Sequence, residues 1–207
     1  MDQSEEIVNF NDTWVWSAHI DCESDNYQKS VIMQKDINKY SELLEYLGDF
    51  PPVHRAFGRL MSGTKSRMKS YSVFRKGINP AWEDNNNHSE FRFILPFKTA
   101  SIFWSMIILN MLEDKLLKDF TNGSRILLDR RGKFRMEIWM SSMEVKTRVE
   151  IESALNKRLA EIKLYLVQKL TENNKNKDYD DVIDELNKTR SIIIKHIPKN
   201  RLYYVKQ

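Results

Sequence analysis

Short apolar runs separated by turn signals restrict the fold of this chain more than any other feature of its sequence. Runs that alternate between apolar and polar residues, or that are rich in β-branched and aromatic types, favour strands. The runs of this kind are 13–17, 30–34, 71–74, 91–95, 126–128, 134–140, 162–170 and 202–205. Asn122-Gly123 is a typical turn, and the turn at 130–133 predicts a hairpin between 126–128 and 134–140. The sequence therefore predicts a sheet of about eight strands.

Three longer segments carry the apolar spacing of helices instead. The first runs from about 36 to 47, the second from 99 or 101 to about 117, and the third from 149 to 159. A further segment, 178–190, has helical character. Short strands joined by hairpins and accompanied by three amphipathic helices indicate an α+β fold. Its sheet is expected to be mainly antiparallel, with the helices on one face and the other face free to bind.

The composition is that of an ordinary globular domain. The chain has 207 residues, of which 41% are hydrophobic, and this is enough for one domain with a substantial core. Its net charge is only +4, so a polyanionic partner is permitted but not required. Cys22 is the only cysteine, which excludes an internal disulfide. An acidic N-terminus and the absence of a long apolar run indicate no signal peptide and no membrane span, so we expect the cytoplasm or the nucleus.

Enzyme signatures are missing from the sequence. The four histidines lack metal-ligand spacing, and neither a glycine-rich phosphate loop nor a G-x-S-x-G motif occurs. Asp and Glu are frequent, but no pair of carboxylates stands out. We therefore expect a protein that is not an enzyme and that needs no metal or cofactor.

The segment 71–84 is the best candidate for a binding site. It reads Y-S-V-F-R-K-G-I-N-P-A-W-E-D, a strand followed by a tight loop that ends in an indole beside a carboxylate. Trp82 and Glu83 suit a planar cationic ligand with hydrogen-bond donors on its edge. Two alternatives stay open from these residues alone: Trp82 is a core residue, and the acidic loop and the basic hairpin 129–135 are solvated turns.

The same segment resembles the central block of the eukaryotic translation initiation factor 4E family, which binds the messenger-RNA cap. The family pattern is Y-x-L-F-[KR]-x-G-I-x-P-x-W-E-D. Further similarities follow in the same order along the chain, at 14–16, 103–104, 138–139 and 199–201. The resemblance implies a curved antiparallel sheet with three helices on its convex face and the cap in its concave face. It also implies one cap-binding domain, 12–207, after a flexible segment 1–11, with extended loops near 49–70 and 171–198.

The resemblance assigns roles to seven residues at the cap. By position, Tyr27 and Trp82 sandwich the 7-methylguanine, Glu83 accepts from the guanine edge, Trp139 packs on the methyl group, and Arg130, Arg135 and Arg92 lie near the phosphates. The methyl group makes the base cationic, and this strengthens its stacking between aromatic rings. The chain departs from the family pattern at Leu128, normally Asn, and at Glu90-Phe91, normally two glycines.

The predicted helices depart further from the family pattern, at residues that the family uses to contact its scaffold partner. A tryptophan of the first helix normally contacts the scaffold partner, and Ser41 stands at its position. Ser105 replaces a leucine of the same interface, whereas Ile37 and Leu109 are retained. The resemblance implies a protein that binds 7-methyl-GTP caps and recruits messages to translation through a factor 4G-like scaffold, or that meets a 4E-binding protein. The alternatives are a cap-binding repressor without the scaffold contact and a single-stranded RNA-binding module without cap selectivity.

Overall fold

The computed structural model describes most of the chain. The described residues are 9–20, 30–49, 52–58, 66–78, 88–129, 132–141, 145–174, 177, 179–188 and 195–198. The strands are β1 (Asn9–Ile20), β2 (Val31–Lys39), β3 (Met68–Arg75), β4 (His88–Leu95), β5 (Thr121–Leu128), β6 (Phe134–Ser141) and β7 (Lys195–Pro198). The helices are α2 (Tyr40–Asp49), α3 (Val53–Ala56), α4 (Ala100–Leu112), α5 (Val145–Asn173) and α6 (Asp180–Lys188).

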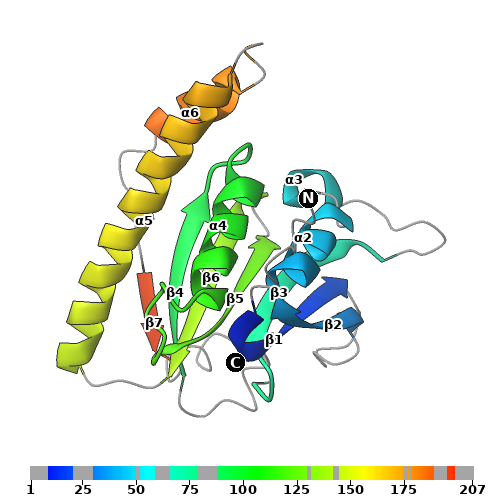
Figure 1. Ribbon diagram of the computed structural model, residues 1–207, viewed down its shortest axis with the longest axis vertical. Coiled ribbons are helices and arrows are strands. Elements are labelled where there is room, and N and C mark those ends of the chain that lie inside the picture. Colours follow the sequence, from blue (N-terminus) through cyan, green and yellow to red (C-terminus); the bar gives the residue numbers. More distant parts are fainter. Residues whose placement is uncertain are drawn as a thin grey trace, which may run out of the picture.

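The strands form one antiparallel sheet in the order β2-β1-β3-β5-β6-β4-β7 (Figure 1). The predicted α+β class and antiparallel pairing are thus confirmed. The sheet has seven strands among the described residues instead of about eight. The predicted strand 202–205 lies outside the described residues, and β1 already begins at Asn9, inside the segment predicted to be flexible.

The predicted strand at 162–170 is wrong, because α5 continues through it to Asn173. Its buried residues repeat every three or four positions, and these are Ile151, Leu155, Leu159, Ile162, Leu166 and Leu170. This spacing makes a continuous apolar stripe on one side of a helix. The stripe packs in the main core, so the helix has a tertiary reason to continue beyond 159. The segments expected to be extended loops contain short regular elements: α3 lies in 49–70, and the end of α5, helix α6 and strand β7 lie in 171–198.

The first helix begins later than predicted. Residues 36–39 belong to β2, where Ile37 pairs with Trp14 of β1 and is fully buried. Asp36 lies four residues before the helix, and its side chain accepts a hydrogen bond from Lys76 Nζ at 2.6 Å. The second helix ends at Leu112, and Asp114 and Leu117 after it adopt positive φ angles of 59° and 51°. Pairing with a neighbouring strand therefore outweighed the local helical pattern before Tyr40.

The helices α2 and α4 lie on one face of the sheet, with α5 beside α4 (Figure 1). The core between them and the sheet is aromatic. Trp104 of α4 lies 5.2 Å from Trp16 of β1 and 6.1 Å from Tyr71 of β3, measured between ring centroids. Trp14 and Trp16 are two residues apart in β1, so they share one face of the strand, and both are buried in this core.

The opposite face of the sheet is different in chemistry, and we call it the polar face. One row across it joins Ser17, Ser72, Arg125, Glu137 and Arg92, which are paired from strand to strand from β1 to β4. The adjacent row joins Phe74, Gly123, Trp139 and Glu90. None of these residues belongs to the main apolar core. Charged and hydroxyl side chains, together with the rings of Phe74 and Trp139, therefore line the sheet on the side away from α2 and α4.

Gly123 lies inside β5, so the turn predicted at Asn122-Gly123 is wrong. The register shifts between Thr121 and Gly123, and the ring of Phe74 packs directly over the Gly123 Cα. A Cβ there would lie 2.3 Å from Cδ1 of Phe74 and 2.7 Å from the Val73 carbonyl oxygen. Glycine is needed at this position because the neighbouring chain approaches closely.

We expect Gly123→Ala to lower the free energy of unfolding by about 1–3 kcal/mol, since it overpacks a buried contact. Urea unfolding followed by circular dichroism measures the change. Gly48→Ala is the matched control, because a Cβ at Gly48 meets nothing within 4 Å. A Gly123→Ala variant as stable as the Gly48→Ala variant would show that the Phe74 ring can move aside.

Candidate functional site

Three of the seven residues assigned to the cap can be placed on the sheet. Trp139 and Arg135 are on β6, and Arg92 is on β4, the neighbouring strand. All three side chains belong to the polar face, by the alternation of the strands. Tyr27, Trp82, Glu83 and Arg130 lie outside the described residues. The sheet thus brings together the predicted methyl-packing indole and two of the predicted phosphate-side arginines.

Trp139 is fully buried, and three neighbouring side chains contact its indole ring. Its Nε1 donates a hydrogen bond to Oε2 of Glu137 at 3.3 Å. The guanidinium of Arg125 lies over the indole, 5.4 Å from the ring centroid, and Phe74 meets it edge-on at 5.3 Å. A cation over an indole face and a carboxylate on its N–H together define one ring orientation.

Glu137 is the centre of a charged cluster that sequence reasoning missed. Arg125 donates to its Oε2 from Nε at 2.8 Å and forms an ion pair through Nη2 at 2.6 Å. Arg135 Nη2 lies 2.8 Å from Oε1, and Arg92 Nε lies 3.8 Å from the same oxygen. Burial alone would raise the pKa of Glu137, but the three guanidinium groups outweigh it and hold that pKa below its ordinary value.

Arg92 has a second carboxylate partner. Its Nε and Nη2 donate to the two carboxylate oxygens of Glu90, the Nη2 bond at 3.0 Å, which makes a bidentate pair. Glu90 is fully buried. Burial lowers the pKa of Arg92 to about 10, so its guanidinium remains charged at neutral pH. The period-two spacings Glu90-x-Arg92 and Arg135-x-Glu137-x-Trp139 are the signals that could have indicated this cluster.

His19 of β1 extends the polar face on the far side of Arg125. Its Nε2 lies 3.0 Å from Ser72 Oγ and its Nδ1 lies 3.4 Å from Ser30 Oγ. Burial, followed by the charges of Arg125 and Lys69, lowers the pKa of His19 to about 3. The imidazole is therefore neutral in the folded protein at any pH near neutrality.

We expect the protein to lose stability as the pH falls below about 6.5, the pKa of an exposed histidine. Below this pH His19 binds a proton in the unfolded chain, whereas in the folded chain it binds one only near pH 3. Between pH 7 and pH 5, His19 is expected to lower the free energy of unfolding by about 2 kcal/mol. Urea unfolding at both pH values measures the loss for the wild type and for His19→Gln. Equal losses in the two proteins would assign the pH dependence to other groups.

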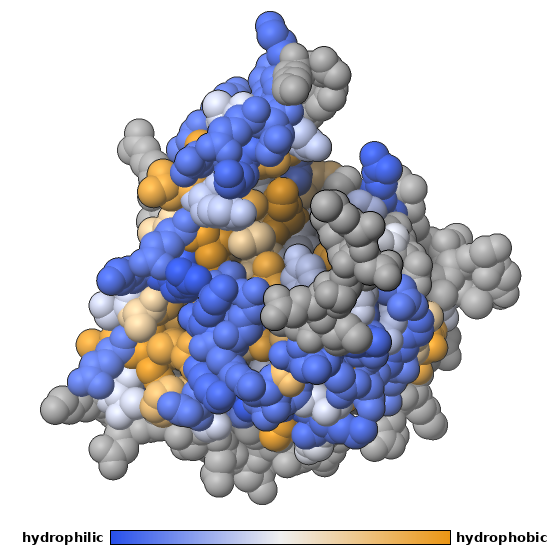
Figure 2. All heavy atoms as spheres, in the orientation of Figure 1, coloured by the Kyte–Doolittle hydropathy of each residue, from blue (hydrophilic) through white to orange (hydrophobic). Residues whose placement is uncertain are grey.

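On the helical side, the four predicted partner residues are spread over three elements. Ile37 is fully buried in β2, so its side chain belongs to the core and offers no surface. Ser41 is exposed on α2, and Ser105 and Leu109 are partly buried on α4. Figure 2 shows apolar residues gathered in the hollow between α5 and α4, where Leu109 lines a groove.

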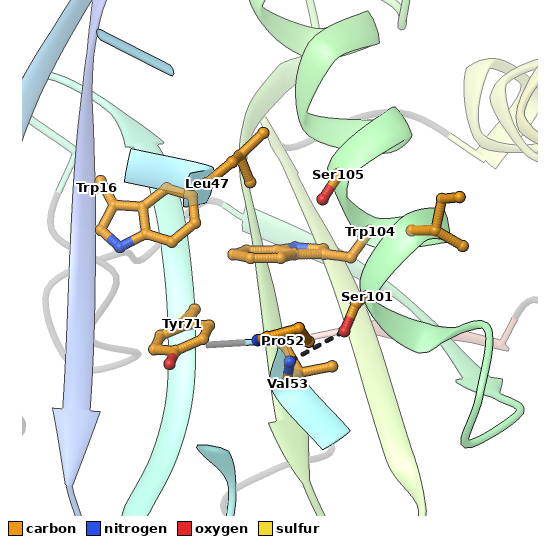
Figure 3. Close-up of a pocket in the computed structure, with 9 residues that line it drawn as sticks. Trp16, Leu47, Pro52, Val53, Tyr71, Ser101, Trp104 and Ser105 are labelled. Carbon is orange, nitrogen blue, oxygen red and sulfur yellow. Dashed lines mark hydrogen bonds between the residues drawn. The ribbon is translucent and has the colours of Figure 1, made fainter. Parts of the chain in front are cut away.

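Ser105 borders a cavity of about 220 Å³ between α2, α3 and α4 (Figure 3). Its walls are mainly apolar and include Trp16, Trp104 and Leu47. Figure 3 shows the rings of Trp16, Tyr71 and Trp104 together among the residues that line the cavity. Ser101 Oγ accepts a hydrogen bond from the Val53 N–H at 2.9 Å.

No helix in the described part of the chain is long and apolar enough to cross a membrane. Within the ranges that the structure describes, no cluster of His, Cys, Asp and Glu side chains could hold a metal ion.

Comparisons with known proteins agree with the geometry. The profile of the family "Eukaryotic initiation factor 4E" matches residues 9–192. No curated protein sequence matches the chain significantly. Among solved structures, a complex of Caenorhabditis elegans eIF4E-3 with the 4E-binding protein Mextli and a cap analogue is similar, with a TM-score of 0.60 and 13% identity over 75% of this chain and 85% of that one.

Two other solved structures have the same fold. Schistosome eIF4E, complexed with m7GpppG and 4E-BP, has a TM-score of 0.61 and 13% identity over 76% of this chain and 84% of that one. Ascaris suum eIF4E-3, complexed with the m2,2,7G cap, has a TM-score of 0.57 and 14% identity over 74% and 85%. The family profile covers nearly the whole described sheet and all of its helices. This chain therefore belongs to the eukaryotic initiation factor 4E family, whose members are cap-binding factors and not enzymes.

Proposed function

We propose that this protein binds the 7-methylguanosine cap of messenger RNA through the polar face of its sheet, as a single cap-binding domain. The observation that carries the proposal is the nearly complete family block at 71–84, which begins within β3 and contains Trp82 and Glu83. Supporting it, Trp139 and the arginines of β4 and β6 lie together on the same face. In this proposal the polar face is the concave face of the family fold.

The base is recognised by stacking and by hydrogen bonds. Tyr27 and Trp82 sandwich the cationic 7-methylguanine, and a stacked base contributes about 1–3 kcal/mol to binding. Glu83 accepts hydrogen bonds from N1 and N2 of the guanine. A carboxylate placed for two donors rejects adenine, which lacks them, because it would be left without partners.

The remaining cap contacts come from β6, β4 and the hairpin. Trp139 packs against the methyl group, and because its indole is fully buried in the free protein this contact requires a rearrangement on ligand binding. The orientation of the indole is set by Glu137 and Arg125. Arg130, Arg135 and Arg92 lie along the phosphate chain. Arg135 and Arg92 already hold carboxylates of the sheet, so they meet the phosphates with their charges partly compensated.

The protein acts in translation initiation in the cytoplasm, by recruiting capped messages through a scaffold partner on its helices. The partner is a factor 4G-like protein or a 4E-binding protein that contacts α2 and α4. A second candidate is a repressor that binds caps without the scaffold, and Ser41 and Ser105 favour it because an interface tryptophan typically supplies 2 kcal/mol or more. A pull-down of the small ribosomal subunit with the protein separates the two, since only the initiation factor brings the subunit down.

Competition for capped RNA tests the cap-binding proposal itself. Free 7-methyl-GTP is expected to displace the protein from capped RNA at a concentration at least about tenfold below that of GTP, because stacking depends on the charge of the base. Equal displacement by the two nucleotides would leave a single-stranded RNA-binding module without cap selectivity as the function.

A further inference from the structure

Five charged side chains form a compact cluster on the polar face. Arg125, Glu137 and Arg92 face one another across β5, β6 and β4, in one row of paired residues. Arg135 stands two residues before Glu137, and Glu90 two residues before Arg92, so both point to the same face. The cluster therefore occupies the part of the sheet where the cap phosphates are proposed to lie.

The arginines of the cluster use their donors within the protein. Arg92 donates hydrogen bonds from Nε and Nη2 to Glu90. Arg125 donates from Nε to Glu137 and forms an ion pair with it through Nη2. Arg135 places Nη2 against the second oxygen of Glu137, while its Nε is buried with no hydrogen-bond partner. A guanidinium binds a phosphate best through two parallel N–H groups. For Arg92 and Arg125, that mode of binding is already taken by a carboxylate.

The carboxylates also compensate the charge. Three arginines and two glutamates give the cluster a net charge of +1, whereas the arginines alone would carry +3. Both carboxylates are fully buried, so solvent cannot separate them from their partners. Glu137 remains ionised at neutral pH because the arginines hold its pKa below the ordinary value. A phosphate chain beside this cluster meets a weak positive field.

We propose that Glu90 and Glu137 are specificity-determining residues, which balance the arginines of the polar face so that this protein selects the methylated base and responds little to the number of phosphates. The inference rests on the proposed cap-binding function. Glu90 stands where the family has a glycine, which could not compensate Arg92. The number of phosphates attached to the base is therefore expected to change the affinity less than methylation of the base does.

Titration of the full chain with 7-methyl-GMP, 7-methyl-GDP and 7-methyl-GTP tests this. For the wild type we expect each added phosphate to lower the dissociation constant by no more than about threefold. This is the size of effect that the single net positive charge of the cluster has on a phosphate several ångströms away in solvent. Glu90→Gln removes one negative charge and keeps an acceptor for Arg92. The ratio of the 7-methyl-GMP constant to the 7-methyl-GTP constant should then rise about fivefold, because the triphosphate gains most from the exposed positive charge.

Two control variants separate the local charge from other effects. Glu150→Gln changes the net charge equally on the exposed surface of α5 and should leave the ratio unchanged. Glu90→Gln combined with Arg92→Gln restores the net charge of the cluster but also removes an arginine proposed to lie beside the phosphates, so the ratio should fall to the wild-type value or below it. Glu137→Gln should shift the ratio in the same direction as Glu90→Gln, and thermal unfolding establishes that each variant is folded.

The outcomes distinguish this inference from the function on which it rests. If the wild type prefers 7-methyl-GTP over GTP but its affinity for the methylated nucleotides rises tenfold or more with each added phosphate, the inference is wrong and cap binding stands. An unchanged ratio in folded Glu90→Gln also overturns the inference alone. If the wild type does not distinguish 7-methyl-GTP from GTP, the proposed function is wrong, and the inference is overturned with it.

Discussion

Glu83→Ala is expected to abolish retention of the protein on 7-methyl-GTP resin while leaving it folded. The carboxylate is proposed to accept from two guanine donors and to face a cationic base. Truncating one partner of such a charge-assisted pair costs about 2–5 kcal/mol. Retention on the resin, with circular dichroism as the test of folding, measures the loss. Asp84→Ala is the matched control, since it removes the next carboxylate in the chain and should leave retention intact.

Two results would contradict the role of Glu83. Full retention of Glu83→Ala on the resin would remove this residue from the cap site. Equal loss in Glu83→Ala and Asp84→Ala, with both proteins folded, would assign the effect to the charge of the whole acidic loop. In that case the guanine edge would need another acceptor.

Glu137→Ala is expected to lower the free energy of unfolding by about 3–5 kcal/mol, the loss typical when one partner of a buried ion pair is removed. The substitution leaves Arg125 and Arg135 without their carboxylate and the Trp139 N–H without its acceptor. Urea unfolding measures the loss. Glu150→Ala on the exposed side of α5 is the control, with an expected change within about 0.5 kcal/mol.

A loss below about 1 kcal/mol in Glu137→Ala would contradict the importance of this cluster for the fold, because surface ion pairs contribute that little. The measurement also bears on the site. If Glu137 sets the orientation of the indole, the near-ultraviolet circular dichroism of the folded variant should change, whereas that of Glu150→Ala should not. The spectrum thus separates a positioning role from a contribution to stability alone.

The sequence predicted the parts of the fold that depend on local patterns and one specific motif. The block at 71–84 led to the correct family, and the alternation at 13–17 placed Trp14 and Trp16 on one buried face. The hairpin of β5 and β6 was also predicted, and its turn is held by a hydrogen bond from the Lys133 N–H to the Asp129 side chain at 3.0 Å. In these segments local preference and tertiary packing agree.

The failures lie where tertiary contacts outweigh the local signal. The run 162–170 is apolar enough for a strand, yet its side chains complete the stripe that α5 buries in the core. Asn122-Gly123 has turn chemistry, but the glycine is required under the Phe74 ring. The residues before Tyr40 have helical spacing, but they pair with β1. Each of these outcomes depends on a neighbour far away in the sequence.

The charged cluster could not have been found without the register of the sheet. Glu90, Arg125 and Glu137 belong to three different strands, and they converge only when Arg125, Glu137 and Arg92 align in one row. The departure from glycine at Glu90 was visible in the sequence. Its consequence was not, because the bidentate contact with Arg92 depends on both side chains lying on the same face.

The central claim is that the polar face recognises a methylated guanine, and tryptophan fluorescence tests it most directly. Trp14, Trp16 and Trp104 are buried in the core on the other side of the sheet, so the response to a ligand should come from Trp82 and Trp139. We expect a saturable quench with 7-methyl-GTP at a dissociation constant at least about tenfold below that for GTP, since the cationic base stacks more strongly. Titrations that give the same constant for both nucleotides would contradict the claim.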